Sequence, residues 1–121
     1  MEIALWITSG ILAAIFLTSG AMKILQPKEK LATSLPWTED FTPATIKLIG
    51  VAELLGAFGL VLPWLTGIAP ILTPIAATGL AIIQLLAIIV HLRRHEAKVI
   101  GFNIVLLLAA AFVAIFRFAG M

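Results

Sequence analysis

The chain contains no cysteine. This absence excludes disulfides, thiolate nucleophiles, and metal or iron–sulfur sites built on cysteine. Any redox role would therefore need a cofactor or a partner protein. The sequence also has no nucleophile motif, no phosphate-binding loop and no haem attachment sequence. Neither of its two histidines, His91 and His95, is paired with a carboxylate at ligand spacing within one helix, so we predict no metal site and no catalytic residue.

Charged residues are scarce. They make up 12% of the 121 residues, and hydrophobic residues make up 62%, whereas a soluble domain has about 25% and about 45–50%. A single domain of this length has too few polar residues to cover a soluble core, so lipid must be its apolar solvent. The net charge is only +2, and the basic residues cluster at the ends of apolar runs. This distribution indicates membrane topology and not nucleic-acid binding.

Long uncharged runs predict the membrane-spanning helices. Residues 3–22 form a run of 20, about the number that crosses 30 Å of hydrocarbon. We assign this run to the mature protein, because Glu2 precedes it without a basic residue and it is too long for a signal peptide. Residues 54–92 carry no formal charge, but one helix of that length would extend almost 60 Å, roughly twice the bilayer core. The run must therefore fold back, and we expect a tight turn between Pro63 and Pro70.

The predicted fold is all-α, an integral membrane four-helix bundle that occupies residues 1–121 as a single domain. The four spans are expected at about residues 3–25, 44–65, 70–92 and 99–118. The linker between the first two spans has two interpretations that stay open. Leu31, Leu35 and Trp37 favour a short amphipathic helix at the membrane surface, and a polar loop is the alternative.

A few polar residues lie inside the predicted spans, on four different helices but in the same half of the membrane. These candidate ligand-binding or proton-binding residues are Lys23, Glu53, Gln84, His91 and Asn103. Gln84 and His91 are seven residues apart and so share one stripe of their helix. We predict that the five residues line a polar pocket that opens toward the cytoplasm. The other half of the bundle is expected to hold no comparable cluster.

Glu53 is the most informative of these residues. A carboxylate at this depth costs about 2.5–3.5 kcal/mol unless it faces the bundle and has a partner. Lys23 and His91 are the candidate partners. A ligand or proton site and a purely structural ion pair are equally open interpretations. Small residues near Glu53 are expected to allow close helix packing: Gly50, Gly56, Ala57 and Gly59.

Several short segments resemble the DoxX family, in its compact DoxX-like form. They are Ser19-Gly20 with Lys23 and Pro27, residues 50–57 (GVAELLGA) continuing to residues 59–63 (GLVLP), and His91 with Arg93-Arg94. The resemblance covers nearly the whole chain and implies a four-helix bacterial inner-membrane protein. Some members of the family are similar to small subunits of a thiosulfate:quinone oxidoreductase, and others belong to membrane oxidoreductase complexes that act in thiol and oxidative-stress balance. The positions carried over from the family pattern are Lys23, Gly50, Glu53, Gly56 and His91.

These observations predict an accessory subunit or small-molecule-binding bundle linked to a membrane oxidoreductase system, and not an enzyme on its own. A quinone is the candidate ligand. The alternatives are a small proton-coupled transporter and a purely structural or assembly protein. The expected partners are the lipid bilayer, other oxidoreductase subunits and a second copy of the chain, but not nucleic acid.

The basic residues predict a multi-pass inner-membrane protein with both termini outside the cytoplasm. Seven of the eight Lys and Arg residues belong to the two loops at the same side, and only Arg117 lies at the other. Because cytoplasmic loops carry the excess of basic residues, a reporter that works only in the cytoplasm should be inactive when it is fused to the C-terminus. Activity of that fusion would reverse the predicted orientation.

Overall fold

The computed structural model describes residues 1–120, except for the side chain of Ser34. Within this range all regular elements are helices and there is no strand. The four long helices are α1 (Glu2–Leu25), α3 (Pro43–Thr66), α4 (Leu72–Arg93) and α5 (Ala97–Ala119), and two short helices, α2 (Lys28–Ser34) and the 3-10 helix η1 (Pro36–Asp40), lie between α1 and α3. Each long helix is long and apolar enough to cross a membrane. The chain is therefore an all-α membrane four-helix bundle, as predicted.

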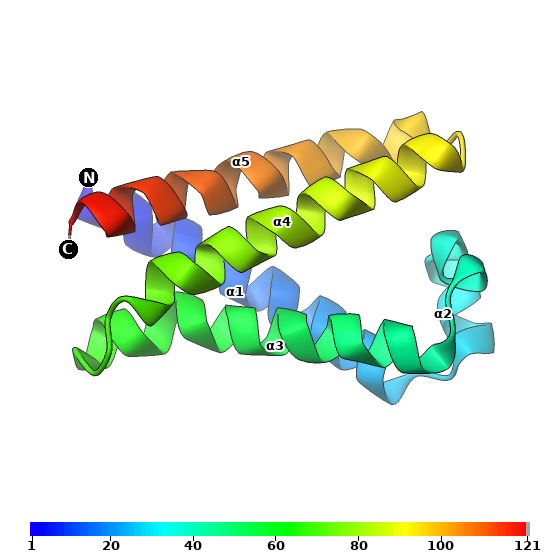
Figure 1. Cartoon of the computed structure of the whole chain (residues 1–121), viewed down its shortest axis with the longest axis horizontal. Coiled ribbons are helices and arrows are strands. Elements are labelled where there is room, and N and C mark those ends of the chain that lie inside the picture. The colour runs from blue at the N-terminus through cyan, green and yellow to red at the C-terminus, as the bar shows by residue number, and fades with distance from the viewer. Residues whose placement is uncertain (121) are drawn as a thin grey trace.

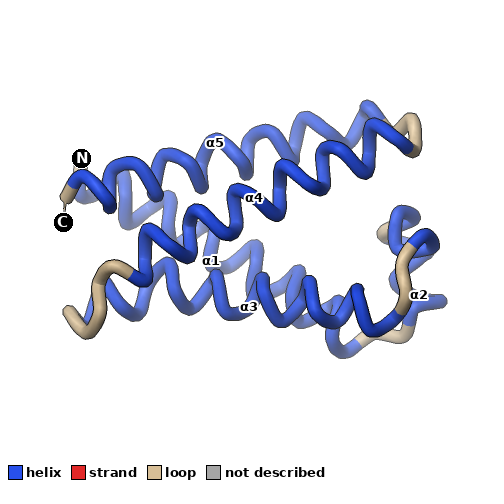
Figure 2. Tube along the Cα trace, in the orientation of Figure 1, coloured by secondary structure: helices blue, strands red, loops and turns tan. Residues whose placement is uncertain are grey.

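The long helices run back and forth between two ends of the bundle (Figure 1). The two termini and the turn between α3 and α4 lie at one end, which we call the terminal end. The helix α2 and the loop between α4 and α5 lie at the opposite end, the linker end. Figure 2 shows that the loops are confined to these two ends. The position of a polar residue along its helix therefore decides at which of the two ends its side chain lies.

Local sequence signals explain where the helices begin and end. At the start of α3 the side chain of Thr42 accepts a hydrogen bond from the backbone N–H of Thr45 at 3.2 Å, and Pro43 occupies the first helical position. The same helix ends at Gly67, whose φ of 73° is the left-handed conformation that glycine favours. The turn that we expected between Pro63 and Pro70 begins only at Gly67, because α3 continues through Pro63 to Thr66.

The linker is folded onto the bundle. It contains α2 and η1, so the short helix, and not the polar loop, is the structure it adopts. Leu31 and Thr38 are almost completely buried, with exposed fractions of 1% and 0%. The chain between α1 and α3 is therefore packed against the linker end of the bundle.

Small residues set the closest contacts between helices. The helices pack chiefly as two pairs, α1 with α3 and α4 with α5. A Cβ atom added at Gly50 would lie only 2.8 Å from the backbone oxygen of Gly20. A Cβ at Gly56 would lie 2.6 Å from a methyl carbon of Leu80. Glycine at these positions allows the backbones of α1, α3 and α4 to approach, as is typical of helix packing in lipid.

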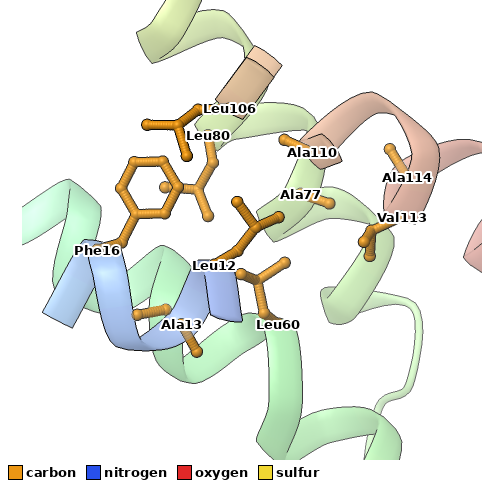
Figure 3. Close-up of a cluster of buried hydrophobic side chains, with 11 residues drawn as sticks. Leu12, Ala13, Phe16, Leu60, Ala77, Leu80, Leu106, Ala110, Val113 and Ala114 are labelled. Carbon is orange, nitrogen blue, oxygen red and sulfur yellow. The ribbon is translucent and has the colours of Figure 1, made fainter. Parts of the chain in front are cut away.

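A hydrophobic core lies between the two ends of the bundle. Figure 3 shows that all four long helices contribute to it, with side chains pointing toward one another. The largest member is Phe16 of α1, which is 1% exposed. Its neighbours in the core include Leu12, Leu60, Leu80 and Leu106. This apolar layer separates the polar side chains of the linker end from those of the terminal end.

The contact between Gly20 and Gly50 should be sensitive to a single methyl group. We expect Gly50→Ala to lower the free energy of unfolding by about 1–3 kcal/mol, because the backbones must move apart. Gly79→Ala is the matched control, since a Cβ there meets nothing within 4 Å. Thermal unfolding in a mild detergent measures both variants. Equal melting temperatures would show that α1 and α3 are not held at this contact.

Candidate functional site

A buried ion pair joins α1 to α3 near the linker end. Lys23 Nζ lies 2.5 Å from Glu53 Oε1, and the two residues are 6% and 2% exposed. Lys23 also donates a hydrogen bond to Ser19 Oγ at 2.7 Å. The Ser19 hydroxyl lies 3.3 Å from each carboxylate oxygen of Glu53 and donates to that carboxylate. We call Ser19, Lys23 and Glu53 the polar triad.

The sequence assembles the triad through helical spacing and small residues. Ser19 and Lys23 are four residues apart, so they lie one above the other on the same face of α1. Glu53 lies three residues after Gly50, and hence on the face of α3 that approaches Gly20. The close backbone contact therefore brings the carboxylate within reach of the ammonium group.

Two cavities flank the triad. The first, the basic cleft, has a volume of about 260 Å³, and its lining includes Lys23, Lys28 and Lys47. The second, the α1 groove, has a volume of about 410 Å³ and is lined by Ala14, Ile15, Thr18, Ser19, Met22 and Leu35. One member of the triad thus lines each cavity, Lys23 the cleft and Ser19 the groove. A molecule in either cavity would be next to the ion pair.

The linker closes over this part of the bundle. The ring of Trp37 in η1 lies 5.7 Å from Lys23 Nζ, at cation–π distance. At the end of η1, Asp40 accepts a hydrogen bond from Arg94 at 2.7 Å. The linker therefore contacts α1 through Trp37 and the end of α4 through Asp40.

The remaining candidate residues form two other groups. Asn103 of α5 donates a hydrogen bond to Gln84 of α4 at 2.8 Å. His91, at the end of α4, donates from Nδ1 to Glu96 Oε1 at 3.0 Å. Among the described residues no hydrogen bond or ion pair joins either group to the triad. Figure 1 shows that α4 diverges from α3 toward the linker end. Gln84 bonds to a residue of α5, and His91 bonds to a residue of the loop after α4.

Charge partners shift the pKa values of two groups in the loop after α4. The hydrogen bond from His91, helped by Arg94, lowers the pKa of Glu96 below its ordinary value. The hydrogen bond to Asp40, with that to Glu96, raises the pKa of Arg94. Both groups therefore stay charged at neutral pH and hold the linker, α4 and the loop together.

A second polar cluster lies at the terminal end, where the sequence led us to expect none. Arg117 of α5 is 1% exposed, and its Nη1 donates to Glu2 Oε1 at 2.5 Å. Its guanidinium carbon lies 5.1 Å from the centre of the Trp6 ring and 4.4 Å from that of Trp64. The expectation that this half of the bundle holds no comparable cluster was wrong, because Arg117 was considered only in the count of charges that sets the topology.

Helical spacing could have revealed this cluster. Arg117 continues the stripe of small and apolar residues that faces the core on α5, since it follows Leu106, Ala110 and Val113 at intervals of four, three and four. A basic residue on a core-facing stripe needs a partner, and Glu2 is the acid at the same end of the bundle. The aromatic rings of Trp6 and Trp64 then cover the guanidinium group.

Comparison with known proteins gives one match. The family model described as the DoxX-like family matches residues 7–113. No curated protein and no solved structure matches the chain. The matched range includes the polar triad, both residues of the Gln84–Asn103 pair and His91, but it ends before Arg117.

The Arg117 cluster should stabilise the terminal end. We expect Arg117→Gln to lower the free energy of unfolding by about 1–4 kcal/mol, because two cation–π contacts in a desolvated position are lost. Arg93→Gln is the control, since that arginine is exposed. Thermal unfolding followed by tryptophan fluorescence measures the change next to Trp6 and Trp64. If both variants melt at the same temperature, the buried arginine contributes nothing to the fold.

Proposed function

Since the chain belongs to the DoxX-like family of membrane proteins, we propose that it is a small-molecule-binding bundle that serves as an accessory subunit of a membrane oxidoreductase system. The observation that supports this proposal is the position of the polar triad between two cavities. A molecule in either cavity would lie beside the ion pair, an arrangement that a role in packing alone does not require. The proposed binding site is the α1 groove, with the triad as its polar wall.

The size and lining of the groove indicate the class of ligand. Its volume of about 410 Å³ falls in the range of about 300–1,000 Å³ that is usual for ligand sites. Apart from the hydroxyls of Thr18 and Ser19, its side chains are apolar. Such a lining suits a mainly apolar molecule that carries a hydrogen-bond acceptor. A quinone fits this description, because its ring is apolar and its two carbonyl oxygens accept hydrogen bonds.

Ser19 is the residue that we propose contacts the ligand, and Glu53 and Lys23 are positioning residues. The Ser19 hydroxyl has one proton, which it donates to the Glu53 carboxylate in the absence of a ligand. When that proton turns to a ligand carbonyl, Glu53 keeps its ion pair with Lys23. The exchange therefore leaves no buried charge without a partner, which would otherwise cost several kcal/mol.

The accessory role follows from what the sequence lacks. Without cysteine and without a cofactor-binding motif, electron transfer would depend on a partner subunit that holds the redox centre. We propose that the linker end faces the cytoplasm, because seven of the eight Lys and Arg residues lie there. Gln84, His91 and Asn103 lie outside the proposed contact with the ligand and join helices and loop instead.

A structural role for the triad is the second candidate. It is favoured by the direct contact between Lys23 and Glu53, which satisfies both charges without any ligand. In that case Glu53→Gln should reduce stability, because Lys23 would be left buried beside a neutral amide, a change that costs about 3–5 kcal/mol in other buried pairs.

Ser19→Ala separates the two candidates, because it removes the hydroxyl and keeps the ion pair. We expect the unmodified protein in mild detergent to bind ubiquinone-1, a short-chain quinone, with quenching of tryptophan fluorescence and a higher melting temperature. Ser19→Ala should weaken this binding about tenfold, the effect of one hydrogen bond of about 1.4 kcal/mol, while its own melting temperature stays near that of the unmodified protein.

The control is Thr78→Ala, which removes an exposed hydroxyl on α4 that bonds only to the backbone oxygen of Pro74. This variant should bind ubiquinone-1 normally. Equal binding by Ser19→Ala and the unmodified protein would contradict the ligand site and leave the structural role. Purification of the same preparations under native conditions should recover an oxidoreductase subunit, and recovery of the chain alone would contradict the accessory role.

A further inference from the structure

We propose that the basic cleft binds the phosphate group of an anionic phospholipid. The cleft lies where the end of α1, the start of α2 and the start of α3 meet, and it is separate from the α1 groove. Three features support a lipid ligand: the free positive charge of the cleft, its apolar lining and its depth in the membrane.

No acidic residue that lines the cleft neutralises its positive charge. Its lining contains Lys23, Lys28 and Lys47 and no acidic residue. Lys23 is paired with Glu53, but among the described residues Lys28 and Lys47 have no ion-pair partner. Two ammonium groups from different helices are therefore available to one anion. Lysine is a common ligand of phosphate, to which it binds as a point charge.

The lining also has an apolar part. Ile24 and Leu25, which are not buried, share the cleft with the lysines, together with the almost completely buried Leu31 and Ile46. A soluble anion such as free phosphate has no use for these side chains, whereas the glycerol and the first acyl carbons of a phospholipid can pack against them. The combination of apolar walls and cationic side chains is that expected for an amphiphile with a negatively charged head.

The cleft lies at the depth where headgroups are found. Leu25 ends the first membrane-spanning helix and Pro43 begins the second, and both line the cleft. The boundary of the hydrocarbon is therefore close to it. The basic residues around the loop after α4 do not line this cleft, and one of them, Arg94, is already paired with Asp40 and Glu96.

The proposal predicts a preference among lipids that depends on Lys28 and Lys47. The full chain, delipidated in a neutral detergent, would be titrated with dihexanoyl phosphatidylglycerol while its melting temperature is followed. Dihexanoyl phosphatidylcholine and sodium phosphate are the comparison probes. We expect phosphatidylglycerol to raise the melting temperature at concentrations at which phosphatidylcholine and phosphate do not. The double variant Lys28→Gln/Lys47→Gln should need at least tenfold more of it, since one lysine near anionic lipid is worth about fivefold in affinity.

The matched control is Lys30→Gln/Lys98→Gln, which removes the same charge from two exposed lysines outside the cleft. This variant should respond to phosphatidylglycerol as the unmodified protein does. Equal losses in both double variants would overturn the proposal in favour of a diffuse surface charge. An equal response to sodium phosphate would overturn it in favour of a free-anion site. Lys28 and Lys47 do not belong to the polar triad, so ubiquinone-1 binding should survive in both double variants. The two proposals can therefore fail independently.

Discussion

The ion pair between Lys23 and Glu53 is the constraint on which the linker half of the bundle depends. Both charges are almost completely shielded from solvent, since the two residues are 6% and 2% exposed, and lipid cannot solvate a charge. The two helices must therefore stay close enough for the pair to form. Gly20 and Gly50 make that approach sterically feasible, and the linker then covers the lysine with an aromatic ring, Trp37. At this end the close packing of α1 and α3, the buried ion pair and the position of the linker therefore depend on one another.

The two ends of the bundle solve the problem of a buried cation in different ways. At the linker end the lysine is paired with an acid that is itself buried. At the terminal end Arg117 is paired with Glu2, whose side chain is 62% exposed, and two tryptophan rings supply the remaining contacts. The second arrangement leaves the acid in contact with its surroundings, so it avoids the desolvation of a carboxylate. Tryptophan suits this position because its ring is apolar but attracts cations and tolerates the membrane interface.

The sequence was sufficient for the membrane spans and for the expectation that Glu53 faces the bundle with a charge partner, because both follow from the energetic cost of placing charge in hydrocarbon. Observed and expected helix ends differ by no more than two residues, and proline or glycine marks several of them, such as Pro43 at the start and Gly67 at the end of α3. The sequence was not sufficient for the grouping of Gln84 with Asn103. That pairing depends on how far α4 diverges from α3, a property of the whole bundle that no local pattern encodes. Arg117 was missed for a different reason: its helical position was available, but it was considered only as one charge in a topology count.

The triad contains a serine in addition to the ion pair, and its hydrogen bonds explain why this hydroxyl is tolerated inside the bundle. Lysine and glutamate alone would satisfy each other, and a third polar group inside a membrane has its own desolvation cost. Two hydrogen bonds offset the desolvation of the Ser19 hydroxyl, because it accepts one from Lys23 and donates one to Glu53. It also lines the α1 groove, so it lies between the buried charges and the proposed ligand site. Since the hydroxyl can redirect its proton without separating the charged pair, the proposed ligand contact falls on the one member of the triad that carries no charge.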